Sequence, residues 1–320
     1  MNRDLRTPQT TALFVMAVFL ATGCAVDEAR REATYARTLQ RTNTALISAG
    51  DADSLAAAAL LVGGPQDRPA ARLALIERAA AAAPDRPDLA WLHLQLCSQV
   101  ETCDPIPLEI RLRALDSTNG AAWFGSLSQA SKLKDDGEMQ AKILSVANTE
   151  RFDIYWNPII AHTTNAVLKT RTMDAATALV AIIGSAAALA IPAYQQISNA
   201  CKGEPLQRPD VLVNCRKVSV VLCRGDTYIT QMIGVAIAKR AWPEGSAEYK
   251  DAVEARQVAQ YRMTLAAGIS TQNLWRESGV LNYLSLLATY RSEQEVALAE
   301  ITKAGLNPNP PPDRTQPGGM

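Results

Sequence analysis

The sequence is poor in the residues from which sheets and most catalytic sites are built. Aromatic residues make up 5% of the 320 residues, and there are only two histidines. Alternating runs of Val, Ile and Thr, which are typical of strands, are scarce. Lys plus Arg equals Asp plus Glu at 32 each, so the chain carries no net charge that would attract nucleic acid. These deficits predict an almost sheet-free protein with no nucleic-acid partner.

Recognisable catalytic motifs are also missing. The sequence has no Gly-rich phosphate loop, no His-Glu-x-x-His helix and no Gly-x-Ser-x-Gly turn. A Ser-His-Asp or Cys-His site would have to use His93 or His162, and neither is near a loop-borne nucleophile. Asp135 and Asp136 are adjacent turn residues whose side chains point apart. We therefore expect no catalytic residue, no cofactor and no enzyme, although a helical muramidase with one or two carboxylates in a cleft stays open.

Alanine, in contrast, is abundant within an apolar share of 48%. It is the best helix former and lets helices approach closely, so we expect an all-α protein. Polar turns divide the chain into successive amphipathic segments. Helices in the C-terminal part are expected over 211–223, 227–242, 247–267, 271–289 and 293–304. Ser246 is a candidate N-cap of the third of these helices, and Ser292 with Glu295 has the pattern of a capping box at the start of the last.

The first 24 residues have the order of a secretory signal. A segment with Arg3 and Arg6 precedes an apolar run that starts at Thr11, and small residues then lead to Cys24. The apolar run has about ten residues, which is too short to span a bilayer of roughly 30 Å. The sequence therefore predicts a signal peptide over 1–23 that is removed on export.

The last residues of this signal, Ala21-Thr22-Gly23-Cys24, resemble the bacterial lipobox. Three positions before the cysteine the family prefers Leu, Val or Ile, and here Ala21 stands there with Leu20 one place earlier. The resemblance implies a diacylglycerol on the sulfur of Cys24, cleavage before it and acylation of the new amino terminus. The alternatives are plain cleaved export and a retained membrane anchor.

The residue after Cys24 is Ala25 rather than Asp. The sorting rule that the lipoprotein resemblance implies then favours the outer membrane of the bacterial cell envelope. The expected partners are the lipid bilayer, through the acyl groups, and a protein or peptide bound by the body of the chain in the periplasm.

The sequence contains six cysteines, and their bonding state is expected to follow from this compartment. In an oxidising environment spaced cysteines form disulfides more readily than metal sites. Cys215 and Cys223 are eight positions apart on one expected helix, so they lie about 12 Å apart along its axis and cannot bond. The economical arrangement acylates Cys24 and leaves Cys223 as a small buried hydrophobe. It contains the pairs Cys97 with Cys103 and Cys201 with Cys215.

A metal cluster of His93, Cys97 and Cys103 is one alternative to the first disulfide, and two free thiols are another. No fourth ligand lies near and no standard zinc spacing occurs, so no metal is expected.

A helix, a polar turn and a Trp early in the next helix occur twice. The first copy begins with the helix 70–83 and leads to Trp91, and the second begins with 108–115 and leads to Trp123, 32 positions later. Over about 70–147 this pattern resembles the tetratricopeptide repeat, without that family's full set of Gly, Tyr, Ala, Phe and Pro positions. The resemblance implies an irregular array of helical hairpins, an α-solenoid in which each pair stacks on the next. Trp91 and Trp123 are weak candidates for contact with a partner, and packing between hairpins is the alternative.

The most apolar internal run covers 173–193. Part of it, 181–195, resembles the first helix of type IV pilins, but a pilin needs this helix at its mature amino terminus. A transmembrane helix is a second interpretation, weakened by the many Ala, Ser, Thr and Gly residues in the run. We expect a buried central helix.

The expected organisation is a signal peptide (1–23), a lipidated amino terminus with a first helix (24–50), tetratricopeptide-like hairpins (51–170), a C-terminal helical region (171–306) and a disordered tail (307–320). A tethered array of this kind predicts an interaction module with a concave partner-binding face. A peptidoglycan hydrolase and a purely structural envelope protein are the alternatives.

Overall fold

The structure is a computed structural model that describes residues 30–61 and 69–311. In these ranges it is all-helical, with no strand and a single isolated bridge between Asn119 and Arg151. The expected all-α class is therefore confirmed. The signal peptide, Cys24 and most of the Pro-rich tail lie outside the described residues.

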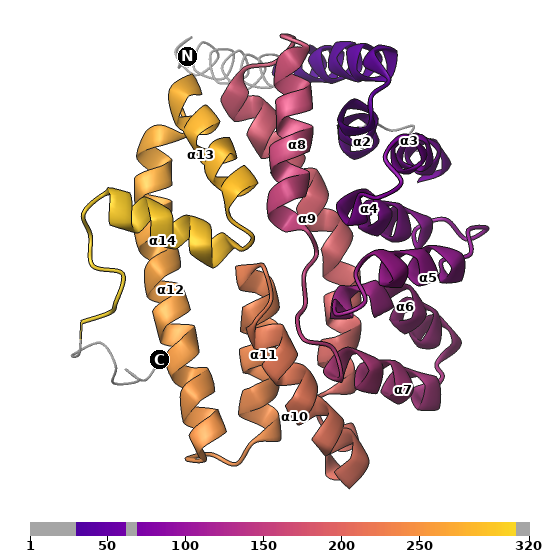
Figure 1. The fold of residues 1–320 in the computed structure, drawn as a ribbon, viewed down its shortest axis with the longest axis vertical. Coiled ribbons are helices and arrows are strands. Elements are labelled where there is room, and N and C mark those ends of the chain that lie inside the picture. The colour runs from indigo at the N-terminus through magenta and orange to yellow at the C-terminus, as the bar shows by residue number, and fades with distance from the viewer. Residues whose placement is uncertain (1–29, 62–68, 312–320) are drawn as a thin grey trace, which may run out of the picture.

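The helices follow one another with short connections (Figure 1). After a helical segment over 30–49 come α2 (Ala52–Leu61), α3 (Pro69–Ala82), α4 (Pro87–Cys97), α5 (Ile106–Leu115), the 3-10 turn η1 (Gly120–Trp123), α6 (Phe124–Leu133), α7 (Asp136–Ala147), α8 (Trp156–Lys169), α9 (Ala175–Ala200), η2 (Glu204–Gln207), α10 (Pro209–Cys223), α11 (Tyr228–Ala241), α12 (Ala247–Asn273), α13 (Glu277–Thr289) and α14 (Glu293–Lys303).

Helices α2 to α7 form a stack along one side of the molecule, and each contacts the next helix in the chain (Figure 1). Helices α2, α4 and α6 also contact α9, and α2 and α4 contact α8. The inner face of the stack is thus covered by the chain's own helices.

Helix α9 lies between this stack and the C-terminal helices, with contacts to α11 and α13 on that other side. Its start is capped by Asp174, whose side chain accepts a hydrogen bond from the N–H of Thr177 at 3.0 Å. Among the described residues α9 alone is long and apolar enough to cross a membrane, judged by length and composition, and 40% of its most apolar stretch is buried in this fold. Its contacts on both sides favour the interpretation as a central packing helix.

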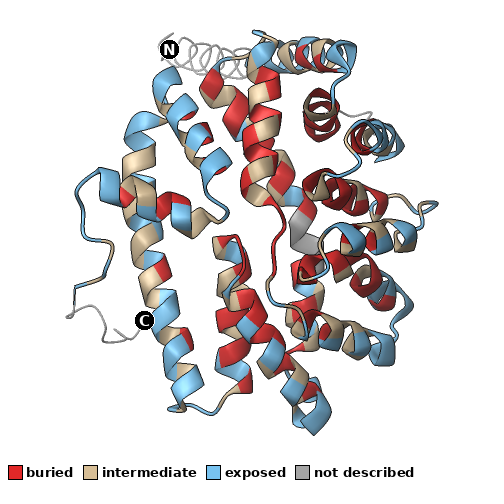
Figure 2. Ribbon diagram, viewed as in Figure 1, coloured by how far each residue is buried: buried red, intermediate tan, exposed pale blue. Residues whose placement is uncertain are grey.

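Aromatic packing joins the two sides of the core. Phe124 lies 5.1 Å from Phe152 and 5.6 Å from Tyr194 between ring centroids, which is the range of favourable aromatic pairs. These three residues come from α6, from the segment before α8 and from α9. Figure 2 shows the buried residues concentrated in the helices around this centre, whereas α12 is mostly exposed.

Both expected disulfides are present. Cys97 bonds to Cys103 across the turn after α4, and Cys201 bonds to Cys215 across the η2 loop. Cys97 and Cys103, considered above as metal ligands together with His93, are therefore bonded to each other. Cys223 is free, as expected, but it is only partly buried, whereas a buried side chain was expected. Burial raises the pKa of its thiol to about 11.

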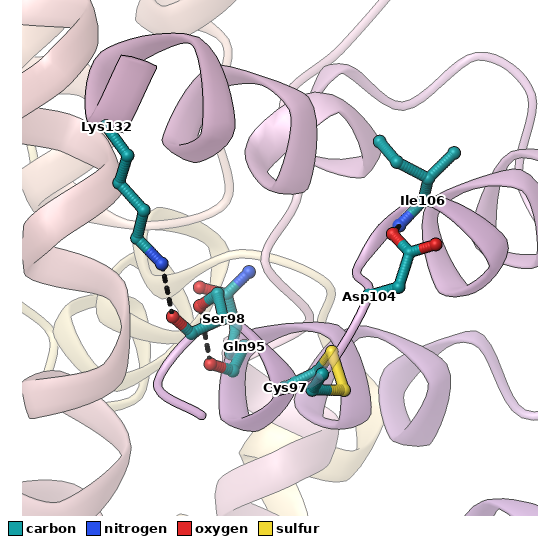
Figure 3. Close-up of a disulfide and its surroundings, with 7 residues drawn as sticks. Gln95, Cys97, Ser98, Asp104, Ile106 and Lys132 are labelled. Atoms are coloured by element: carbon teal, nitrogen blue, oxygen red, sulfur yellow. Dashed lines mark hydrogen bonds between the residues drawn. A yellow bond between two sulfur atoms is a disulfide. The ribbon is translucent and has the colours of Figure 1, made fainter. Parts of the chain in front are cut away.

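The turn at the first disulfide is also held by hydrogen bonds (Figure 3). The hydroxyl of Ser98 donates to the carbonyl oxygen of Gln95 at 2.7 Å, and Lys132 of α6 donates to the carbonyl oxygen of Ser98 at 3.2 Å. The disulfide and these bonds together fix how α4 ends and how α6 lies against it.

The boundary between α12 and α13 differs from expectation by more than two residues. Helix α12 continues through Gly268 to Asn273, although it was expected to end at 267, and α13 begins at Glu277 instead of 271. An added Cβ at Gly268 would meet nothing within 4 Å, so this glycine does not mark a turn. The close approach occurs later, where a Cβ on Gly279 would lie 2.0 Å from the carbonyl oxygen of Asn273. The glycine that the turn requires is therefore Gly279.

The start of the Pro-rich tail lies on α12. Arg262 donates from Nε to the carbonyl oxygen of Pro308 at 3.1 Å. Residues 304–311 contain no further helix, and the rest of the expected disordered tail is outside the described residues.

Candidate functional site

The two tryptophans considered for partner contact lie in the packed part of the array. Trp91 is 2% exposed within α4, so it offers no surface to a partner and its role is packing. Trp123 is half-buried, and the guanidinium carbon of Arg113 lies 4.1 Å from the centroid of its ring. The surroundings of both tryptophans therefore favour packing between hairpins over contact with a partner.

The two histidines lie in different surroundings on the N-terminal side of the molecule. His93 is half-buried in α4, burial lowers its pKa, and its buried Nδ1 has no hydrogen-bond partner among the described groups. His162 lies on α8 with Nδ1 3.8 Å from a carboxylate oxygen of Asp53. No group of three or more potential metal-ligating residues occurs in the described part of the chain.

The most apolar cavity in the described part of the chain lies on the other side of α9. It has a volume of about 600 Å³, within the range of ligand-binding sites, and is lined by residues of α8, α9, α11, α12, α13 and α14 and of the segment before α8. Most of its lining is aliphatic or aromatic. The lining residues are Ile154, Trp156, Ile183, Ala187, Tyr194, Thr227, Tyr228, Ile229, Met232, Met263, Ala266, Ala267, Ser270, Tyr283, Glu293, Val296, Ala297 and Glu300.

Two carboxyl groups of α14 face this apolar space. Glu293 is in the first turn of the helix, and its Oε2 accepts a hydrogen bond from the backbone N–H of Tyr228 at 2.7 Å. Glu300 lies two turns further along, and the hydroxyl of Ser270 donates to it at 3.3 Å. Burial raises the pKa of both carboxyls, because the apolar surroundings disfavour their charged forms.

Two phenols complete the polar part of the lining. Burial and the neighbouring Glu293 raise the pKa of Tyr228 to about 12 and raise that of Tyr283 as well, so both are neutral at physiological pH. The hydroxyl oxygen of Tyr228 is buried and has no hydrogen-bond partner among the described groups. It is available to a group that enters the cavity.

Large apolar side chains are exposed where the cavity meets the surface. Ile229 of α11 is 48% exposed and Met263 of α12 is 43% exposed, and both belong to the lining. An apolar rim that leads into an apolar interior is suited to binding an apolar group from solution.

Sequence reasoning did not find this site. Its lining comes from six helices and contains no motif with fixed spacing. The only related signal was the capping box at the start of α14, where Ser292 and Glu295 bond reciprocally as expected from the sequence. That motif positions Glu293 in the first helical turn but says nothing about the cavity beside it.

Comparison with protein-family models, with curated proteins and with solved structures finds no match for this chain. Its function has to be argued from the residues and their geometry.

Proposed function

We propose that this protein is a lipid-anchored binding protein of the bacterial outer membrane, a helical interaction module without catalysis. Its protein or peptide partner inserts apolar side chains into the cavity between α9 and α14. The observation that carries this proposal is the apolar cavity itself, with Ile229 and Met263 exposed at its rim. Grooves of this kind commonly receive the apolar face of a partner helix.

The proposed fold of the array is an irregular, tetratricopeptide-like solenoid. The contacts between each helix and the next from α2 to α7 support it. Because α8 and α9 cover the inner face of this stack, the partner is expected at the cavity and not at the concave face that a free solenoid would offer.

The proposed anchor is Cys24, with its sulfur attached to diacylglycerol and the body of the protein in the periplasm. The two disulfides support an oxidising compartment.

Mass spectrometry of the protein purified from bacterial membranes tests the anchor. We expect a mature chain that begins at an acylated Cys24, with four of its other cysteines in disulfides. The variant Cys24→Ser is expected to lack the lipid and to leave the membrane fraction. An intact chain with Met1 and six reduced cysteines in the soluble cytoplasm would contradict the proposal.

Filling the cavity is expected to abolish binding of an apolar probe. Ala267 lines the cavity from α12, so Ala267→Trp places an indole in the space that a ligand needs. We expect N-phenyl-1-naphthylamine, a dye that becomes fluorescent in apolar sites, to bind this variant about tenfold more weakly, a loss of about 1.4 kcal/mol.

The matched control for this variant is Ala255→Trp. Ala255 is an exposed alanine on the same helix and is not part of the lining. It is expected to leave dye binding unchanged. Equal binding by all three proteins would show that the dye does not use the cavity.

A peptidoglycan hydrolase is the second candidate. A buried glutamate with a raised pKa, such as Glu293, is suited to act as a general acid. The predominantly aliphatic lining argues against it, because a sugar needs many hydrogen-bonding partners. Release of soluble fragments from purified peptidoglycan, lost in Glu293→Gln, would establish this activity, whereas a purely structural protein would neither release fragments nor bind a partner.

A further inference from the structure

The acidic groups of the cavity are not balanced by basic groups within it. None of the described lining residues is Lys or Arg, whereas Glu293 and Glu300 both belong to the lining. The chain as a whole has equal numbers of acidic and basic residues, so this imbalance is a local property of the cavity.

Two basic side chains near the cavity, Lys303 and Arg262, have hydrogen-bond partners elsewhere. Lys303 donates from Nζ to Oδ1 of Asn282 at 3.0 Å, and Arg262 donates from Nε to the carbonyl oxygen of Pro308. The attraction of Lys303 favours the charged form of Glu300 to some extent. Glu293 has only the backbone N–H of Tyr228 as a described hydrogen-bond donor to its side chain.

The position of Glu293 suits it to hold a cation. It lies in the first turn of α14, where the helix dipole stabilises a negative charge. Most of the surrounding side chains are apolar, so a cation brought next to Glu293 would interact with it more strongly than at the protein surface. The unpartnered hydroxyl oxygen of Tyr228, on the residue whose N–H binds Glu293, can accept a further hydrogen bond from such a group.

We propose that the partner segment which enters the cavity carries a lysine or arginine beside its apolar side chains, and that this cation pairs with Glu293. The inference rests on the proposed function, because it specifies the chemistry of the partner at the same site. An acidic segment would place like charges together in an apolar space and is disfavoured.

Three helical peptides test the inference. Each has about 15 residues with leucines on one face, and they differ only in one residue beside that face, which is Lys, Gln or Glu. We expect the Lys peptide to displace N-phenyl-1-naphthylamine from the full-length protein at about tenfold lower concentration than the Gln peptide, because a charge-assisted hydrogen bond is added. The Glu peptide is expected to be the weakest.

The variant Glu293→Gln is expected to reduce the preference for Lys over Gln to about twofold or less, because its amide oxygen can still accept from the N–H of Tyr228 but carries no charge. The control Glu254→Gln removes an exposed charge from α12 and is expected to leave the tenfold preference intact. The comparison of peptides on the unaltered protein needs no variant, so it stays valid if Glu293→Gln folds poorly.

The results separate the two proposals. Equal displacement by the Lys and Gln peptides, with both lost in Ala267→Trp, would overturn the cation preference and leave the proposed binding function standing. Dye binding without displacement by any peptide would overturn both the inference and the peptide partner. Self-association of the protein that Ala267→Trp removes would identify a second copy as the occupant and would also overturn the inference.

Discussion

Trp91→Ala is expected to lower the free energy of unfolding by about 3 to 5 kcal/mol, as large-to-small changes at buried aromatic residues do. The side chain is 2% exposed in α4, a helix that contacts α3, α5, α6, α8 and α9. Alanine would leave a cavity among these five helices. The indole N–H has no hydrogen-bond partner among the described groups, so its removal orphans no acceptor and lost packing sets the size of the effect.

Equilibrium unfolding in urea, with the disulfides kept intact, measures this loss. Trp275→Ala is the matched control, because Trp275 is 78% exposed and its removal is expected to change stability by about 0.5 kcal/mol or less. A Trp91→Ala protein of normal stability that no longer binds its partner would show that Trp91 is a contact residue after all.

Asp226→Ala is expected to cost about 4 kcal/mol. One carboxylate oxygen of Asp226 accepts hydrogen bonds from the backbone N–H groups of Ile154 and Trp156, both at 3.1 Å, while its own backbone N–H donates to the carbonyl oxygen of Phe152. Alanine would leave two donors without an acceptor at the junction between the N-terminal array and α11. Each orphaned buried donor costs about 1 to 3 kcal/mol.

Asp226→Asn is expected to behave differently, since an amide oxygen can keep both hydrogen bonds. Burial, and then the neighbouring Asp153 carboxylate, raise the pKa of Asp226 well above its usual value of 3.8. A carboxyl group whose pKa is raised by folding stabilises the protein at pH values below its unfolded pKa, and this contribution is lost as the pH rises through the folded pKa. Asparagine does not titrate. The free energy of unfolding of Asp226→Asn, relative to that of the unaltered protein, should therefore increase over the same rise in pH.

Thermal or urea unfolding at several pH values tests the loss of stability in Asp226→Ala and the pH dependence predicted for Asp226→Asn. The unaltered protein and both variants are compared. The alanine variant is expected to be the least stable throughout, and the difference between asparagine and aspartate to depend on pH. A pH-independent difference would mean that Asp226 is ionised in the folded protein across the range tested.

Local features of the chain could be predicted because their causes are local. The caps at Ser246 and Ser292 depend on a side chain and a backbone N–H three residues later, and both are present as expected. The impossibility of a Cys215–Cys223 bond followed from the rise of one helix, and Cys215 bonds to Cys201 instead. The boundary between α12 and α13 was missed because it depends on the close contact between Gly279 and the carbonyl group of Asn273, which exists only once the two helices are packed.

By itself the sequence determined an all-α protein, the position of most helices and the pairing of four cysteines, since propensity, capping and helix rise act over a few residues. Only the tertiary structure decided that α9 covers the inner face of the array, that Trp91 is buried and that Glu293 lies beside an apolar cavity. These properties depend on how helices from distant parts of the chain cross and pack. Their crossing is set by the combined shape of many side chains, which no short stretch of sequence contains.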